Sequence, residues 1–494
     1  MLLKTDGTLA PSGRAYARAA PRLDAATGPA VGPWGLYVAA WTALAAGSAL
    51  AYKLGVPYQL ILIVLAPLTV VGIAWKPVFG VCLVSAMLPF GAAIIFPGTV
   101  TADRGVGLLF GVGAAFNMVV TRKGLRFLNP VGLGLASISL LSVLSVLWAI
   151  VPEAATAFSL TLVQLLIYAI LIMSVCRRVE DICWPLRAFV AACMACFFAG
   201  LVLGVVGGEE ARFAFALGGI RVNPNVQGAM FGVGVLSALY LYRREGARLW
   251  RWMCMAALLI LPVAVLRTGG RKAAWFLGLV ILWSLVSPRS AIRRSRMALA
   301  LAGVLVLGVV AAGVARTYLL PAHVAERLVE KTGIAEAFWA RYMIIVDSIR
   351  YVARHPLGAG MGCFVASIGG FRGVVHNDLF YVMSSVGPVG GLVFAAFAFS
   401  LVRMVWRMKQ GLDRWFAGSV VAYYLLIGLG GTYIFDKNYW LFLSFAWLLA
   451  QFPREAVTAE AAGPSLLPFY PARGLPLVKS PRRTSLLPTA ADST

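Results

Sequence analysis

The chain has 494 residues, of which 61% are hydrophobic and only 13% are charged, and its mean hydropathy is +0.85. These values exclude a water-soluble globular protein and a disordered chain, and they are typical of a protein with many membrane-spanning helices. The net charge of +24 is concentrated between apolar runs, so we attribute it to membrane topology and lipid headgroups and expect no nucleic-acid partner.

Apolar runs of membrane-spanning length recur along most of the chain. Backbone polar groups find no hydrogen-bond partner in lipid except within a helix or barrel, so each run predicts a helix. We therefore expect an all-α, polytopic membrane helix bundle with about 12 to 14 transmembrane helices. The candidate runs are residues 34–52, 58–75, 78–96, 106–120, 131–150, 157–175, 188–206, 226–242, 252–266, 273–286, 297–314, 379–402, 415–435 and 439–452.

Basic residues support an alternating arrangement of these runs. If the N-terminus is cytoplasmic, most of the 43 Lys and Arg residues fall in cytoplasmic segments, as the positive-inside rule requires. Both termini are then cytoplasmic. The expected organisation is an N-terminal segment at 1–33 without a cleavable signal peptide, a membrane domain at 34–452, and a disordered tail at 453–494 that is rich in Pro, Ser and Ala.

Cysteines predict no disulfide within the external part. Cys193 and Cys196 form a C-x-x-C inside an apolar run, where buried thiols are favoured over a redox pair, and only Cys363 is expected outside.

Several cations are predicted on the external side, where topology selects against them. Arg221 precedes Asn225 at the start of one run, and the turn after residue 266 contains Arg267, Arg271 and Lys272 around two glycines. One interpretation is snorkelling to phospholipid phosphates. The other is a pyrophosphate site, because arginine binds phosphate oxygens bidentately and a glycine-rich turn at a helix N-terminus offers backbone donors.

The large external loop at 315–378 is expected to contain amphipathic helices. At 100° per residue, Arg341 falls on an inward face of the helix at 335–354, and a desolvated arginine needs an anionic partner, either in a structural salt bridge or in a substrate. The inward face also holds Ile344, Ile345, Ser348 and Val352, whereas Asp347, Arg350 and Arg354 share the polar face.

After this helix, Pro356 and the glycines at 358, 360 and 362 predict a sharp turn. Of the three histidines, His376 stands at the mouth of the run at 379–402 and is suited to a general base near neutral pH. The alternative is an interfacial histidine before a helix capped by Asn377 or Asp378. External carboxylates show no metal-ligand spacing, so we expect no metal and no cofactor.

His376-Asn377, nine residues, Gly387-Pro388-Val389-Gly390 resembles the His-Asn-x9-Gly-x-x-Gly signature of O-antigen ligases and their relatives. Also similar are Asn223-Pro224-Asn225, the segment from Arg341 to His355-Pro356-Leu357-Gly358-Ala359-Gly360, and Thr268-Gly269-Gly270-Arg271, where relatives commonly have Thr-x-Ser-Arg. The likeness covers roughly residues 205–400, and Gly270 departs from the usual Ser.

The resemblance implies a metal-independent, inverting GT-C type glycosyltransferase that takes a glycan from undecaprenyl pyrophosphate on the outer face of a bacterial inner membrane. Arg221, Arg271 and Arg341 would hold the pyrophosphate, with Asn225, Arg267, Lys272 and Asn377 as further substrate-binding candidates, and His376 would deprotonate the acceptor. The acceptor is a lipid A core or another surface molecule in a ligase, and a lipid-linked repeat in a polymerase of O-antigen or exopolysaccharide. A transporter or flippase is the third reading, which the absence of paired halves disfavours.

Overall fold

The computed structural model describes residues 58–93, 101–122, 124–202, 216–217, 220–286, 331–364 and 375–461. These residues are helical apart from connecting turns and one short antiparallel pair, β1 (Ala216–Leu217) and β2 (Ile220–Arg221), in which Ala216 lies opposite Arg221. The expected all-helical fold is therefore confirmed for this part of the chain. The helices are α2 (Tyr58–Trp75), α3 (Pro77–Met87), η2 (Leu88–Ala93), α4 (Ala102–Thr121), α5 (Pro130–Ser145), η3 (Val146–Trp148), α6 (Pro152–Val175), α7 (Val179–Val202), α8 (Pro224–Arg244), α9 (Arg248–Arg267), α10 (Arg271–Val286), α13 (Lys331–Arg354), α15 (Asp378–Trp406), α16 (Leu412–Leu429) and α17 (Lys437–Ala461).

Each predicted span within the described residues corresponds to a helix, while the runs at 34–52 and 297–314 lie outside them. Six described helices are long and apolar enough to cross a membrane, so the structure supports a membrane protein but does not confirm 12 to 14 spans. The six are Asp103–Thr121, Pro130–Trp148, Pro152–Val175, Val179–Val202, Arg248–Arg267 and Asp378–Trp406.

Helices α8 and α17 lie in the interior of the bundle. This explains why they are less apolar than the six helices with membrane-spanning character. Both are buried along nearly their whole length within the first compact unit of the chain, Met1–Ala450. Tyr240 of α8 stacks on Phe416 of α16 with ring centroids 4.5 Å apart, and Phe442 of α17 meets Phe189 of α7 at 4.9 Å. A helix enclosed by protein need not be apolar on every face.

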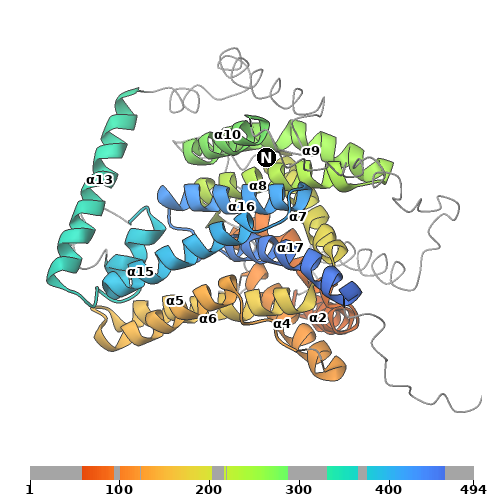
Figure 1. Ribbon diagram of the computed structural model, residues 1–494, viewed down its shortest axis with the longest axis horizontal. Helices are drawn as coiled ribbons and strands as arrows, with labels where there is room; N and C mark the ends of the chain where they lie inside the picture. Colours follow the sequence, from red (N-terminus) through yellow and green to blue (C-terminus); the bar gives the residue numbers. More distant parts are fainter. Residues whose placement is uncertain are drawn as a thin grey trace, which may run out of the picture. The chain divides into compact units, whose positions relative to one another are not determined.

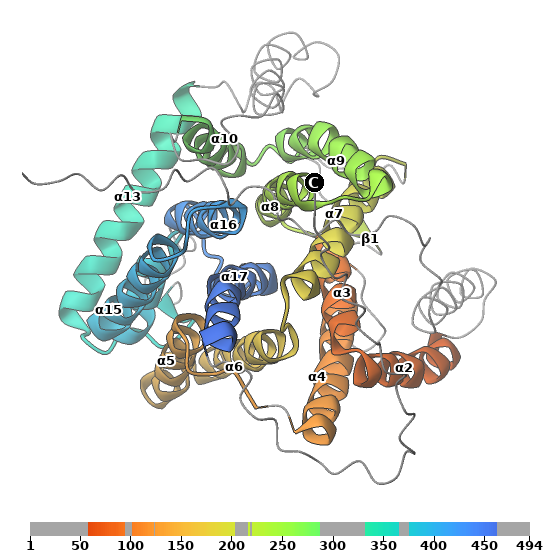
Figure 2. The ribbon, with the colours of Figure 1, turned by 45° about the vertical axis from the view of Figure 1, so that its right-hand side comes forward.

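The C-terminal helices lie between two groups of earlier helices. Figure 1 shows α15 and α16 with α5 and α6 on one side and α8 and α10 on the other, and α15 contacts α5 while α16 contacts α8 and α10. In Figure 2, α17 lies beside α15, α16 and α7, consistent with the contact between Trp440 and Phe397 of α15 (5.5 Å). The second unit, Gln451–Thr494, continues α17 to Ala461, so the first residues expected in the tail are helical.

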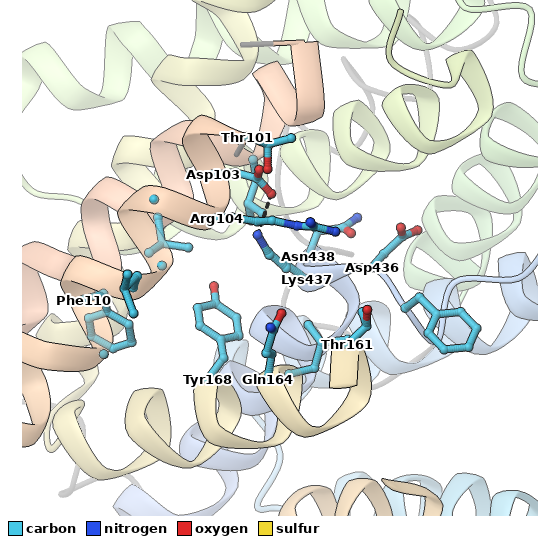
Figure 3. Close-up of a pocket in the computed structure, with 18 of the residues that line it drawn as sticks. Thr101, Asp103, Arg104, Phe110, Thr161, Gln164, Tyr168, Asp436, Lys437 and Asn438 are labelled. Carbon is cyan, nitrogen blue, oxygen red and sulfur yellow. Dashed lines mark hydrogen bonds and ion pairs between the residues drawn. The ribbon is translucent and has the colours of Figure 1, made fainter. Parts of the chain in front are cut away.

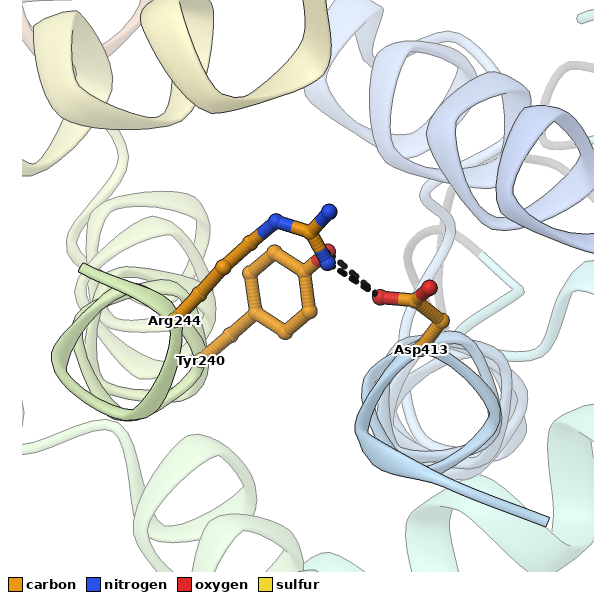
Figure 4. A network of polar contacts seen from close by, with 3 residues as sticks. All are labelled: Tyr240, Arg244 and Asp413. Atoms are coloured by element: carbon orange, nitrogen blue, oxygen red, sulfur yellow. Dashed lines mark hydrogen bonds and ion pairs between the residues drawn. The ribbon is translucent and has the colours of Figure 1, made fainter. Parts of the chain in front are cut away.

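Polar contacts between helix ends fall into two sets. In the first set, Arg244 at the end of α8 forms an ion pair of 3.0 Å with Asp413 at the start of α16, and the Tyr240 hydroxyl donates to the same carboxylate oxygen at 2.7 Å (Figure 4). In the second set, Lys437 pairs with Asp103 at 2.6 Å. The alternation predicted from the sequence would place the first set on one side of the membrane and the second on the other. The contacts therefore agree with the predicted directions of these helices relative to one another.

Two helix boundaries differ from the predicted runs for identifiable reasons. Helix α7 begins at Val179 rather than near 188. The helix can include Arg187 because its guanidinium donates a hydrogen bond to Glu245 (Nε to Oε1, 2.7 Å) and stacks over the ring of Trp184 at 4.3 Å. Helix α16 ends at Leu429 rather than near 435, and the residues that follow form a loop that contributes to the candidate site.

Candidate functional site

The turn between α9 and α10 is built by Thr268 and the two glycines after it. The Thr268 hydroxyl donates to the Val265 carbonyl at 2.7 Å and accepts from the Gly270 amide at 3.2 Å, while Gly269 has φ of +61°. A residue in this left-handed conformation is most readily glycine. The chain therefore reverses within a few residues and places Arg267 and Arg271 at the ends of adjacent helices, with Lys272 in the first turn of α10.

The N-terminus of α8 packs directly on this turn. A Cβ atom on Gly228 would lie 2.6 Å from the Thr268 hydroxyl, so only glycine allows this approach. A Cβ atom on Gly270 would lie 3.9 Å from Oδ1 of Asn225, on the same side as Thr268. The two patterns that the sequence separates by about 40 residues, Asn223-Pro224-Asn225 and Thr268-Gly269-Gly270-Arg271, are thus neighbours in space.

Lys272 extends from this turn to the C-terminal end of α16. A Cβ atom on Gly430 would lie 2.8 Å from Cδ and 3.4 Å from Nζ of Lys272. The preceding carbonyl, of Leu429, accepts from the Asn377 side chain at 3.1 Å, and Oδ1 of Asn377 caps α15 by accepting from the Phe380 amide at 3.2 Å. Asn377 is therefore buried and holds α15 against α16, and its contact with a substrate stays a prediction.

His376 lies beside Asn377 with an exposed side chain, and its backbone is anchored on both sides. The Thr432 hydroxyl donates to the Val375 carbonyl at 2.5 Å. Asp378 is 2% exposed, and its Oδ1 accepts from the amides of Tyr433 at 2.8 Å and Ile434 at 3.2 Å. The sequence suggested Asp378 only as a helix cap, whereas its side chain fixes the loop after α16 against the start of α15.

We define the turn site as the residues that these contacts connect. It comprises Asn225, the turn from Arg267 to Lys272, His376 and Asn377. The side chains of Arg221, Arg271 and Arg341 lie outside the described part of the chain. Their roles remain predictions.

Helix α13 has the orientation that its pattern predicts. Ile344, Ser348 and Val352 are buried, whereas Arg350 and Arg354 are exposed. The helix packs on α15. The side chain of Arg341 lies outside the described part of the chain, so its inward orientation stays a prediction.

The two other motifs of the resemblance, residues 355–360 and 387–390, contact each other at a kink in α15. Val386 and Gly387 leave the helical conformation, with φ of +78° at Gly387. The carbonyls of Ser384 and Ser385 that the kink frees accept from the amides of Ala359 (3.0 Å) and Gly360 (2.9 Å) in the glycine-rich turn. A Cβ atom on Gly387 would lie 2.0 Å from the Pro356 carbonyl oxygen. These glycines therefore serve close backbone packing.

A cavity of about 680 Å³ lies on the same side of the bundle, between α4, α6, the start of α8 and the start of α17 (Figure 3). We call it the α4–α17 cavity. Its volume is in the range of ligand sites. It combines apolar walls with polar groups from Thr101, Asp103, Arg104, Thr161, Gln164, Tyr168, Asn223, Asp436, Lys437 and Asn438.

Two carboxylates of the α4–α17 cavity differ in their environment. Asp103 pairs with Lys437, whereas Oδ2 of Asp436 has no hydrogen-bond partner among the described residues. Burial raises the pKa of Asp436 to about 7. The sequence did not reveal this cavity, because its polar residues come from four separate segments that share no motif.

No protein-family model matches the chain, and no curated protein matches it. The resemblance to O-antigen ligases thus rests on the sequence motifs alone, and membership of that family stays a prediction.

Proposed function

We propose that this protein is a membrane glycosyltransferase that transfers a glycan from undecaprenyl pyrophosphate to a hydroxyl of a lipid A core or another surface acceptor. The observation that supports this proposal is the convergence of three separate sequence patterns. Asn225, the Thr268–Lys272 turn and the His376-Asn377 pair are joined through contacts at Gly270, Gly430 and Leu429. If each motif served only the packing of its own helix, the three motifs would not need to contact one another.

The turn site offers the two functions that the reaction requires. Arg221, Arg271 and Arg341, assisted by Arg267 and Lys272, would bind the pyrophosphate and stabilise the charge that it gains on leaving. The acceptor oxygen attacks the anomeric carbon from the face opposite the pyrophosphate, the bond from that carbon to the pyrophosphate oxygen breaks, and the acceptor proton passes to a ring nitrogen of His376. The exposed His376 side chain on an anchored backbone fits this role.

The proposed location is a bacterial inner membrane, with both termini cytoplasmic and the turn site facing the periplasm. The support is the distribution of basic residues and the grouping of helix ends. Single cysteines introduced beside Arg271 and His376 should be labelled from outside in spheroplasts, and cysteines beside Arg244 and Arg407 should not. All the native cysteines are free, and only Cys82 is not buried, so background labelling should be low.

The decisive experiment is a transfer assay with purified protein in nanodiscs, undecaprenyl-pyrophosphate-linked glycan and EDTA. A glycan joined to the lipid A core supports a ligase, and longer lipid-linked chains support the alternative, a polymerase of repeat units. An unchanged donor, or intact donor moved between leaflets of proteoliposomes, would contradict the glycosyltransferase proposal. His376→Ala is the inactive variant, and His355→Ala is its control because His355 is exposed and stacks on Tyr351 at 4.5 Å.

A further inference from the structure

The charges around the α4–α17 cavity nearly balance. Asp103 and Asp436 are its acidic lining residues, and Arg104 and Lys437 are its basic ones. Asp103 and Lys437 also neutralise each other through their 2.6 Å ion pair. Because Asp436 is partly protonated near pH 7, the lining carries an excess of less than one positive charge. A pyrophosphate carries at least two negative charges, so this lining favours an uncharged polar ligand.

Several polar atoms that face this cavity have no partner among the described residues. Tyr168 is 8% exposed, and its hydroxyl is buried without a hydrogen bond, as are Oδ2 of Asp436 and Oδ1 of Asp103. Figure 3 shows the Tyr168 hydroxyl and the Gln164 amide pointing toward Lys437 and Arg104 across the cavity. Buried polar atoms normally have partners, so these donors and acceptors are arranged for a ligand with several hydroxyl groups.

Helix α4 leaves room for such a ligand. Gly107 and Gly111 lie one turn apart and line the cavity, and a Cβ atom on either would meet nothing within 4 Å. The half-buried ring of Phe435 adds apolar aromatic surface to the lining. Hydroxyl-binding groups beside aromatic faces suit a sugar, which has polar edges and apolar C–H faces.

We propose that the α4–α17 cavity binds an uncharged carbohydrate, either the glycan of the donor or that of the acceptor. Its role in catalysis rests on the proposed function. One loop connects it to the turn site: Gly430 contacts Lys272, Tyr433 and Ile434 are held by Asp378, and Asp436 faces the cavity. With sugar bound in the cavity at one end of this loop and pyrophosphate bound in the turn site at the other, the donor and the acceptor would be held in a fixed orientation for transfer.

Gly107→Leu tests the proposal because Gly107 lines the cavity and a Cβ atom there meets nothing within 4 Å, so the larger side chain should occupy part of the space. The matched control is Gly278→Leu in α10, where a Cβ atom also meets nothing within 4 Å and which does not line the cavity. The probe is an array of bacterial surface oligosaccharides that lack pyrophosphate, applied to detergent-purified protein. We expect wild type and Gly278→Leu to bind at least one glycan, and Gly107→Leu and Asp436→Ala to bind it at least tenfold more weakly.

Failure of wild type to bind any glycan, or equal binding by wild type and Gly107→Leu, would overturn the proposal. Gly111→Leu replaces Gly107→Leu if the latter does not fold. The binding assay involves no transfer, so it can succeed even if the protein has no transferase activity, and transfer can be observed even if no cavity binding is found. In the transfer assay, a raised KM for acceptor or for donor in Gly107→Leu identifies which glycan the cavity holds.

Discussion

The turn site and the α4–α17 cavity lie on the same side of the bundle but are built in opposite ways. The turn site contains three cations within six consecutive residues, Arg267 to Lys272, and its glycines create a compact reversal. The cavity draws one acid and one base from the start of α4 and one of each from residues 436–437 at the start of α17, and it carries little net charge. The difference suggests a division of labour, in which the turn site holds the charged leaving group and the cavity holds neutral sugar.

The largest effect should come from His376→Ala. Removing the proton acceptor should lower single-turnover transfer by about 100-fold to 10,000-fold, the range for general bases. Donor binding should change little, since the pyrophosphate is held by other residues. Single-turnover transfer and donor affinity are measured on the same preparation, with His355→Ala as control. Near wild-type transfer by His376→Ala would assign the base role to another residue and leave His376 as an interfacial side chain.

Arg271→Ala should weaken both donor binding and turnover. Loss of one contact to the pyrophosphate should cost about 2 to 4 kcal/mol, or about 30-fold to 1,000-fold in kcat/KM. Arg271→Lys should restore only part of this activity, because an ammonium group cannot bind two oxygens in parallel. Arg350→Ala, on the exposed face of α13, should remain near wild type. If Arg271→Ala leaves donor affinity intact while abolishing glycan-array binding, the proposed division between the two regions is wrong.

Gly387→Ala should destabilise the kink of α15 and the glycine-rich turn that packs against it. Its φ of +78° and the 2.0 Å approach of a Cβ atom to the Pro356 oxygen require the glycine-rich turn to move. With ψ of −176°, this backbone conformation is essentially restricted to glycine and costs about 1 to 3 kcal/mol in another residue. We expect a melting temperature several degrees lower and reduced transfer, with glycan binding retained. Gly391→Ala is the control, since a Cβ atom there meets only the flexible Met383 side chain at 3.2 Å. Equal melting temperatures for both variants would contradict the structural role of the kink.

Asp436 should produce a smaller, pH-dependent effect. Its pKa of about 7 in the folded protein exceeds the ordinary 3.8, so the folded state retains a proton that the unfolded state releases. Stability should therefore fall as the pH rises from about 4 to 7 and change little above 7. Asp378, Tyr424 and Tyr433 interact with this carboxylate, and Arg104 and Lys437 share its cavity.

The pH effect is measured as the melting temperature of wild type and Asp436→Asn from pH 5 to pH 8. The variant should gain stability relative to wild type as the pH rises. A difference that is independent of pH would show that Asp436 does not titrate in this range and that its environment is less buried than the structure indicates.

Local patterns in the sequence determined much of this protein. Apolar runs predicted the described helices other than α13, because within lipid a helix forms all its backbone hydrogen bonds internally. The 3.6-residue period of α13 identified Ile344, Ser348 and Val352 as buried and Arg350 and Arg354 as exposed. The glycines at 358, 360 and 362 predicted a sharp turn, and all three have positive φ. These properties depend on residues close together in the chain.

Only the tertiary structure determined how distant segments meet. The contact of Lys272 with Gly430, the bonds from Asp378 to the loop after α16, and the kink of α15 at Gly387 each join parts that no local period relates. The α4–α17 cavity is the clearest case, because Gly107 leaves space only where α6 and α17 pack beside α4. Hydropathy encodes which face a helix buries, whereas the volume left between packed helices depends on all their side chains together.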